Sequence, residues 1–174
     1  MRREAAEISP ALLAGGGEIS RLTPHASRLS PILVIGIGNP SRGDDALGPL
    51  LIDRLAAMEL TDVELLTDFQ LQVEYVLDLA GRRQVIFVDA SVSEPEPFAF
   101  RALQPSRDAS HSSHALSPAA LLASCDQVGV KPPAQSFVLA IRGYRFELGE
   151  PLSEEAGDNL AAASDFLVRH LRTM

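Results

Sequence analysis

Blocks of apolar residues alternate with amphipathic stretches along most of the chain. The first block, residues 32–37, is continuous and rich in β-branched side chains, which is typical of a strand buried on both faces of a sheet. A stretch with apolar residues at helical spacing follows it, at Leu47, Leu50, Leu51, Leu55 and Met58. A strand followed by a helix is the first half of a βαβ unit.

Further blocks repeat this order. Residues 63–66 and 137–141 predict strands, residues 85–88 predict a strongly buried strand, and residues 98–103 predict a strand at an edge of the sheet. Between the second and third strands, residues 72–79 predict a short helix whose inner side carries Val73, Val76, Leu77 and Ala80.

Two serines mark the expected starts of the last helices. Ser117 is followed by Pro118, and proline is favoured at the first helical position because its missing N–H is not needed there. Ser153 is followed by two glutamates, which stabilise the positive end of a helix. The final helix has an apolar stripe at Ala156, Leu160, Ala163, Leu167 and Leu171.

This alternation predicts an α/β fold, a three-layer sandwich with a mainly parallel, twisted sheet flanked by helices. We expect one domain over residues 31–174. Residues 1–30 contain a run of three glycines and no sustained periodicity, so we expect a disordered N-terminal extension there. In sheets of this kind, ligands bind beyond the carboxyl ends of the strands, which directs attention to the residues that follow each strand.

Composition narrows the possible partners. The formal net charge is −8, which argues against nucleic-acid binding because that function needs a surplus of Lys and Arg. We find no apolar stretch of about 20 residues that could span a bilayer. Cys125 is the single cysteine, so an internal disulfide is impossible, and we expect this side chain to pack on or near a helix. We expect a cytoplasmic protein.

The first strand leads into a glycine-containing loop, Gly36-Ile37-Gly38-Asn39-Pro40-Ser41. One interpretation is a dinucleotide-binding loop of the form G-x-G-x-x-G, and a nucleotide-dependent α/β enzyme is therefore one alternative. The loop departs from that form because Ser41 replaces the last glycine and Pro40 removes an N–H that would bind phosphate. The following Asp44 and Asp45 would also repel a pyrophosphate.

Three side chains with useful chemistry follow different elements of the predicted sheet. Asp45 lies at the start of the first helix, Asp89 directly follows the 85–88 strand, and His114 precedes the Ser117 helix. Each also has an ordinary structural explanation, as a helix-terminal acid, a loop-bracing acid and a solvated histidine. Together, two carboxylates and one imidazole suit a divalent transition metal with open coordination positions. His111 is a competing candidate for the histidine.

Residues 32–48, I-L-V-I-G-I-G-N-P-S-R-G-D-D-A-L-G, resemble the opening of the hydrogenase maturation proteases. That family has an apolar strand, G-x-G-N, a short loop, an acidic pair and a nearby glycine. The resemblance continues through V-I-F-V-D-A at residues 85–90 and S-H-A-L at residues 113–116. It covers about residues 31–171 and implies an α/β sandwich, in agreement with the pattern above.

The resemblance implies an endopeptidase, of the aspartic type, that removes a C-terminal extension from the large-subunit precursor of a nickel–iron hydrogenase after nickel insertion. Asp45, Asp89 and His114 fall on the family's nickel-contacting positions. The implied metal is the nickel of the precursor, with no intrinsic cofactor, and we expect a monomer. A non-catalytic nickel-binding checkpoint protein would use the same residues. Phe69 and Gln70 replace a small Gly/Thr-rich segment of many relatives, which suggests a different hydrogenase target, of a cytosolic bidirectional or NAD-linked type.

Overall fold

The computed structural model describes residues 31–106 and 116–174. They form a five-stranded sheet in the order β2-β1-β3-β5-β4. The strands are β1 (Ile32–Ile37), β2 (Val63–Asp68), β3 (Gln84–Ser91), β4 (Phe98–Ala102) and β5 (Gln135–Arg142). All neighbouring strands pair in parallel except β4, which is antiparallel to β5 at one edge. The predicted α/β architecture and the edge position of residues 98–103 are confirmed.

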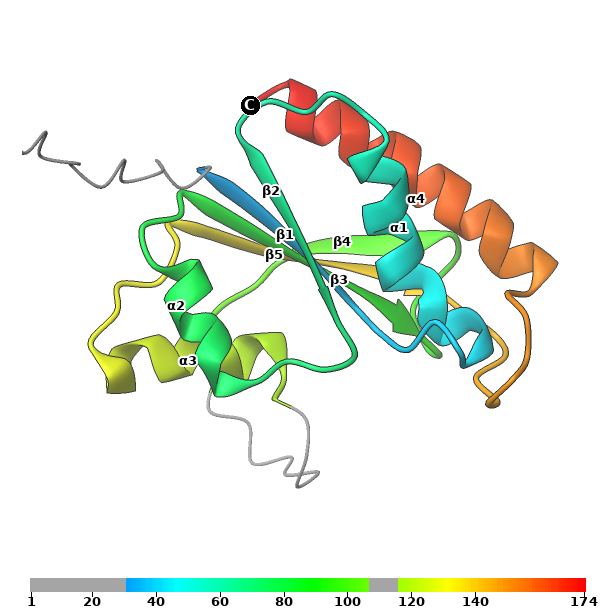
Figure 1. Ribbon diagram of the computed structural model, residues 1–174, viewed down its shortest axis with the longest axis horizontal. Helices are drawn as coiled ribbons and strands as arrows, with labels where there is room; N and C mark the ends of the chain where they lie inside the picture. The colour runs from blue at the N-terminus through cyan, green and yellow to red at the C-terminus, as the bar shows by residue number, and fades with distance from the viewer. Residues whose placement is uncertain (1–30, 107–115) are drawn as a thin grey trace, which may run out of the picture.

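Helices cover both faces of this sheet (Figure 1). One face packs against α1 (Leu47–Ala56) and α4 (Glu154–Arg172), and the other carries α2 (Val76–Leu79) and α3 (Pro118–Val128). Side chains alternate along each strand, so Val34 and Ile86 join the α1/α4 core while Ile35 and Phe87 join the α2/α3 core. Two separate apolar cores therefore hold a three-layer sandwich together.

The capping predictions are confirmed. The Ser117 Oγ accepts a hydrogen bond from the Ala120 N–H at 3.1 Å, and the Ser153 Oγ accepts one from the Ala156 N–H at 3.3 Å. The five stripe residues of α4 are all buried. Cys125 lies buried on α3, as expected for a small packed side chain.

The short helix after β2 differs from its prediction. Its first turn is a 3-10 helix, η2 (Val73–Tyr75), and only then does α2 begin. The prediction of Val73 and Leu77 on the inner side is wrong, because their side chains are 50% and 66% exposed. Val76 and Leu79 are the buried residues instead. The tighter 3-10 turn has three residues per turn rather than 3.6, so a pattern read with α-helical spacing assigns the wrong face.

Two other predicted boundaries are wrong by a few residues. The predicted first helix includes Met58, but α1 ends at Ala56 and Met58 lies beyond it, partly exposed. The predicted 85–88 strand ends before Asp89, but β3 continues to Ser91 because Ala90 and Ser91 still pair with Ile141 and Arg142 of β5. Within the described parts of the chain, no helix has the length and apolar character needed to cross a membrane.

Candidate functional site

The loop between β1 and α1 is positioned by glycines that allow backbone segments to approach closely. Gly38 has φ +138°, and a Cβ atom there would lie 1.9 Å from the Asp45 carbonyl oxygen. A Cβ on Gly48, in the first turn of α1, would lie 2.2 Å from the Ile37 carbonyl oxygen and 2.9 Å from that of Val88. No other residue fits at either position. The start of α1 is therefore held tightly against the carboxyl ends of β1 and β3.

The two acidic residues at this junction, Asp44 and Asp45, have different environments and different roles. A 3-10 turn, η1 (Gly43–Ala46), carries both residues, but Asp44 is fully buried whereas Asp45 is partly exposed. Asp45 accepts a hydrogen bond from the Asn39 N–H at 2.9 Å through one carboxylate oxygen. The loop thus fixes the orientation of Asp45 while keeping its side chain within reach of a ligand.

Asp44 ties this loop to the segment between β5 and α4. Its carboxylate accepts hydrogen bonds from the backbone N–H groups of Tyr144 (2.7 Å), Arg145 (3.0 Å) and Ser153 (2.8 Å), and from the Ser153 hydroxyl at 2.8 Å. Burial favours the neutral acid, but these donors outweigh burial and hold the pKa of Asp44 below its usual value. Asp44 is therefore a structural anion, and no local sequence pattern distinguishes it from Asp45.

Asp89 lies near the carboxyl end of β3, in a partly buried position. It follows Phe87 and Val88, which belong to the α2/α3 and α1/α4 cores respectively, so strand alternation directs its side chain to the α2/α3 side of the sheet. Burial raises the pKa of Asp89 to about 7, and the negative charge of Asp45 adds to this rise, while a hydrogen bond from the Ala90 N–H opposes it. The structure thus brings two of the predicted site residues into electrostatic contact.

His114 and the competing His111 lie outside the described residues. The chain re-enters the described part at Leu116, whose N–H donates to the Leu71 carbonyl oxygen at 3.3 Å. Leu71 belongs to the segment after β2, and this segment is tied to the glycine loop because the Gly38 N–H donates to the Asp68 carbonyl oxygen at 3.0 Å. Among residues 31–106 and 116–174, no three His, Cys, Asp or Glu side chains form a metal-binding group.

A hydrogen-bonded pair, Tyr75 and Asp68, borders the site and was not predicted from the sequence. The Tyr75 hydroxyl donates to a carboxylate oxygen of Asp68 at 2.6 Å, and the other oxygen of Asp68 accepts the Phe69 N–H at 2.6 Å. Burial, together with the Asp68 carboxylate, raises the pKa of Tyr75 to about 12. The pair fixes the segment that carries Phe69 and Gln70, both of which are exposed. No sequence motif marks a contact between residues seven positions apart across a strand end.

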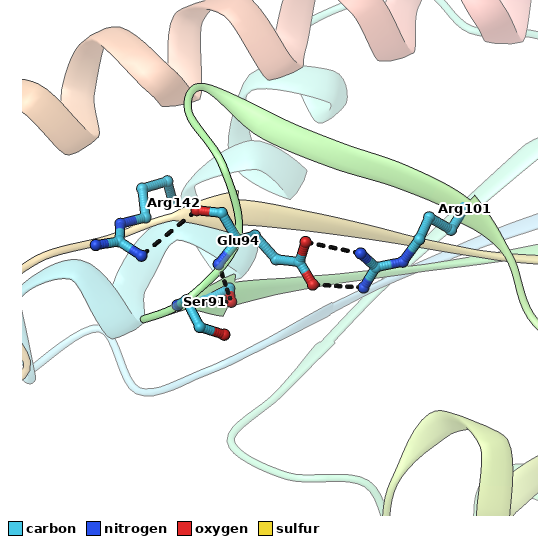
Figure 2. A network of polar contacts seen from close by, with 5 residues as sticks. Ser91, Glu94, Arg101 and Arg142 are labelled. Carbon is cyan, nitrogen blue, oxygen red and sulfur yellow. Dashed lines mark hydrogen bonds and ion pairs between the residues drawn. The ribbon is translucent and has the colours of Figure 1, made fainter.

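A polar network braces the connection between β3 and β4, just beyond Asp89 (Figure 2). Glu94 accepts two hydrogen bonds from the Arg101 guanidinium, at 2.7 and 2.5 Å. Arg142, at the end of β5, donates to the carbonyl oxygens of Val92 and Glu94. The Ser91 hydroxyl accepts the Glu94 N–H at 3.2 Å. These contacts hold residues 91–94, which follow Asp89, against the end of β5.

The backbone of the glycine loop has no N–H group to offer a phosphate. Each N–H group of the loop already donates a hydrogen bond within the protein. The donor and acceptor residues are Gly38 to Asp68, Asn39 to Asp45, Ser41 and Arg42 to Asn39, Gly43 to Glu150, and Asp44 to Arg145. Pro40 has no N–H. Phosphate-binding loops need free N–H groups directed at the ligand. The geometry therefore argues against the nucleotide interpretation.

Known structures resemble this fold closely. A scan against sequence-family profiles finds no match, and neither does a search of curated proteins. The NiFe hydrogenase maturation protease HycI from Thermococcus kodakarensis is 26% identical, with a TM-score of 0.64 over 82% of this chain and 93% of that one. The hydrogenase 2 maturation peptidase from a Thaumarchaeota archaeon is 27% identical, with a TM-score of 0.58 over 80% and 97%. The hydrogenase maturating endopeptidase HybD from E. coli, 23% identical over 82% and 92%, has a TM-score of 0.65 and shares the fold.

Proposed function

We propose a substrate and a way of recognising nickel for this chain, which belongs to the hydrogenase maturation protease family and is a peptide hydrolase. The substrate is the large-subunit precursor of a nickel–iron hydrogenase, from which the enzyme removes a C-terminal extension after nickel has been inserted. The protein acts in the cytoplasm, as a monomer that meets the precursor transiently. The observation that carries the proposal is the pair of carboxylates, Asp45 on η1 and Asp89 near the end of β3, at the carboxyl edge of the sheet.

In this proposal the nickel of the precursor is part of the substrate, and Asp45, Asp89 and His114 bind it. Carboxylate and imidazole ligands are acceptable to that ion. Asp45 is fixed by the Asn39 N–H and Asp89 by the Ala90 N–H, so each carboxylate keeps one oxygen that these hydrogen bonds do not use. His114 is the third ligand in this proposal because it falls on the family's nickel-contacting histidine position.

Two chemical routes are open once the precursor is docked. The nickel could polarise the scissile carbonyl or lower the pKa of a bound water. Alternatively, nickel could serve only for recognition while a carboxylate acts as general base. In both routes water adds to the carbonyl carbon, the C–N bond breaks and the amine leaves with a proton.

A processing assay tests this function. Purified precursor, nickel-loaded or nickel-free, is incubated with the wild type and with Asp45→Ala, Asp89→Ala and His114→Ala, and the product is measured by intact mass. We expect loss of a C-terminal peptide only from the loaded precursor and only with all three residues intact. Asp53→Ala, an exposed acid on α1, is the matched control and should cleave normally.

The same assay separates the remaining alternative. Nickel-dependent association without any change in the precursor's mass would make the protein a binding checkpoint and would contradict the proposed cleavage. Equal cleavage of loaded and nickel-free precursor would instead contradict the role of nickel. Full activity of the three alanine variants would show that the hydrolytic site lies elsewhere on the protein.

A further inference from the structure

Three large apolar side chains are exposed in the nine residues after β2. Phe69, Val73 and Leu77 have exposed fractions of 65%, 50% and 66%, and we call them the β2–α2 patch. Val73 and Leu77 lie about one turn apart on the outward side of η2 and α2, since Val76 and Leu79 occupy the inward side. Single exposed apolar residues are ordinary, but a cluster of large ones marks an interaction surface.

The β2–α2 patch begins beside the candidate active site and leads away from it along η2 and α2 (Figure 1). It begins one residue after Asp68, whose carbonyl oxygen accepts the Gly38 N–H of the loop that carries Asp45. It also belongs to the α2/α3 layer, and Asp89 points to that same side of the sheet. A polypeptide bound along the patch would therefore lie on the same side of the sheet as Asp89, with its end at Phe69 nearest the two carboxylates.

The segment that carries the β2–α2 patch is acidic. Between Asp68 and Gly81 it contains Asp68, Glu74 and Asp78, and its first Arg residues follow only at Arg82 and Arg83. Glu74 lies exposed between Val73 and Leu77 in the sequence. The whole chain carries a net charge of −8. A partner that buries the apolar side chains here meets negative charge at the rim, and complementary rim charges favour the correct partner and speed its association.

We propose that the β2–α2 patch docks a segment of the hydrogenase precursor in which large apolar side chains are flanked by Lys or Arg. This inference rests on the proposed function. Binding at the patch holds the precursor at a distance from the bond that is cleaved. Such remote contacts lower KM when they are equally strong in the ground state and the transition state. The patch is thus a binding surface and takes no part in the chemistry.

The test replaces the patch with polar side chains in Phe69→Ser/Val73→Ser/Leu77→Ser. A matched control, Met58→Ser/Val128→Ser/Met174→Ser, removes three exposed apolar side chains elsewhere on the surface. Cleavage of nickel-loaded precursor is followed over a range of precursor concentrations, and folding of each variant is checked by thermal unfolding. We expect the patch variant to raise KM at least tenfold while kcat stays within about twofold, and the control to match the wild type.

A charge reversal tests the second half of the proposal. Glu74→Lys should raise KM by roughly threefold or more at low salt, with the difference shrinking at high salt as charges are screened. Glu59→Lys, an exposed acid beyond α1, is the control and should have no effect. Equal KM for Glu74→Lys and wild type at low salt would overturn the requirement for a basic segment.

Failure of this inference differs from failure of the proposed function. A wild type that cleaves no precursor contradicts the function itself. A wild type that cleaves, beside a patch variant with unchanged KM or a loss confined to kcat, overturns the docking surface alone. Sedimentation of the wild type gives one further contrary outcome: self-association that the patch variant abolishes would assign the patch to a second copy of this chain.

Discussion

At the scale of single residues, Asp44 and Asp45 have opposite environments despite being neighbours. Four donors surround the Asp44 carboxylate, which is fully buried, whereas Asp45 accepts one backbone N–H and stays partly exposed. Stability should therefore depend on the first acid and ligand binding on the second.

Replacing Asp44 tests its structural role. Asp44→Ala leaves the N–H groups of Tyr144, Arg145 and Ser153 and the Ser153 hydroxyl without their acceptor, which should lower the free energy of unfolding by roughly 3–5 kcal/mol. Urea denaturation followed by circular dichroism measures this loss. Asp53→Ala on the exposed side of α1 should change stability by no more than about 0.5 kcal/mol, and an equal loss in both variants would contradict the anchoring role.

Asp89 should make stability depend on pH. An unfolded aspartate has a pKa of about 3.9, whereas the folded value is raised to about 7. Between these values the folded state binds more protons than the unfolded state. The free energy of unfolding is therefore undiminished by Asp89 below about pH 4 and falls as the pH rises toward 7. Asp89→Asn removes this titration and should stabilise the protein by roughly 2–4 kcal/mol more at pH 8 than at pH 5. Parallel stability curves for wild type and variant would disprove the raised pKa.

At the scale of elements, the junction of β1 with α1 depends on the absence of side chains. Gly38→Ala should place a methyl group into the Asp45 carbonyl at a positive φ, so we expect loss of more than about 3 kcal/mol and displacement of Asp45. Gly81 also has a positive φ, +74°, but a Cβ atom there would meet nothing within 4 Å. Gly81→Ala should therefore cost only about 1 kcal/mol. Thermal unfolding of the two variants distinguishes the steric clash, which only Gly38→Ala introduces, from the backbone strain of a positive φ, which both variants share.

The elements also show what can be read from the sequence. Continuous apolar runs and Ser caps locate β1, β3, β5, α3 and α4, because each pattern arises from burial or from one local hydrogen bond. The pattern assigns α2 the wrong face because a 3-10 turn precedes it. It also misses the extension of β3 to Ser91, because pairing with β5, and not local apolarity, sets where the strand ends.

The candidate site can be predicted only in part for the same reason. Strand ends place Asp45 and Asp89 at one edge of the sheet, since parallel strands end together. The different role of Asp44 depends on contacts with residues about 100 positions away, such as Tyr144 and Ser153. The Asp68–Tyr75 contact likewise depends on the course of the chain after β2. Sequence spacing contains no information about such tertiary contacts.

At the scale of the whole molecule, the sheet should open from its two edges. β1, β3 and β5 are each paired on both sides, whereas β2 pairs only with β1, β4 pairs only with β5, and both edge strands have partly or fully exposed side chains. Hydrogen exchange followed by mass spectrometry should therefore show the slowest exchange in β1 and β3 and faster exchange in β2 and β4. Uniform protection across all five strands would indicate a single cooperative opening instead.

The different roles of Asp44 and Asp45 have a genetic consequence. Because Asp44 holds two loops together, its substitution reduces the fraction of folded enzyme, and cells that carry it should regain hydrogenase processing when grown at lower temperature. Substitution of Asp45 leaves the fold intact and removes a proposed ligand, so cooling should restore nothing. A screen for conditional alleles would therefore recover the first position and not the second, although the two codons are adjacent.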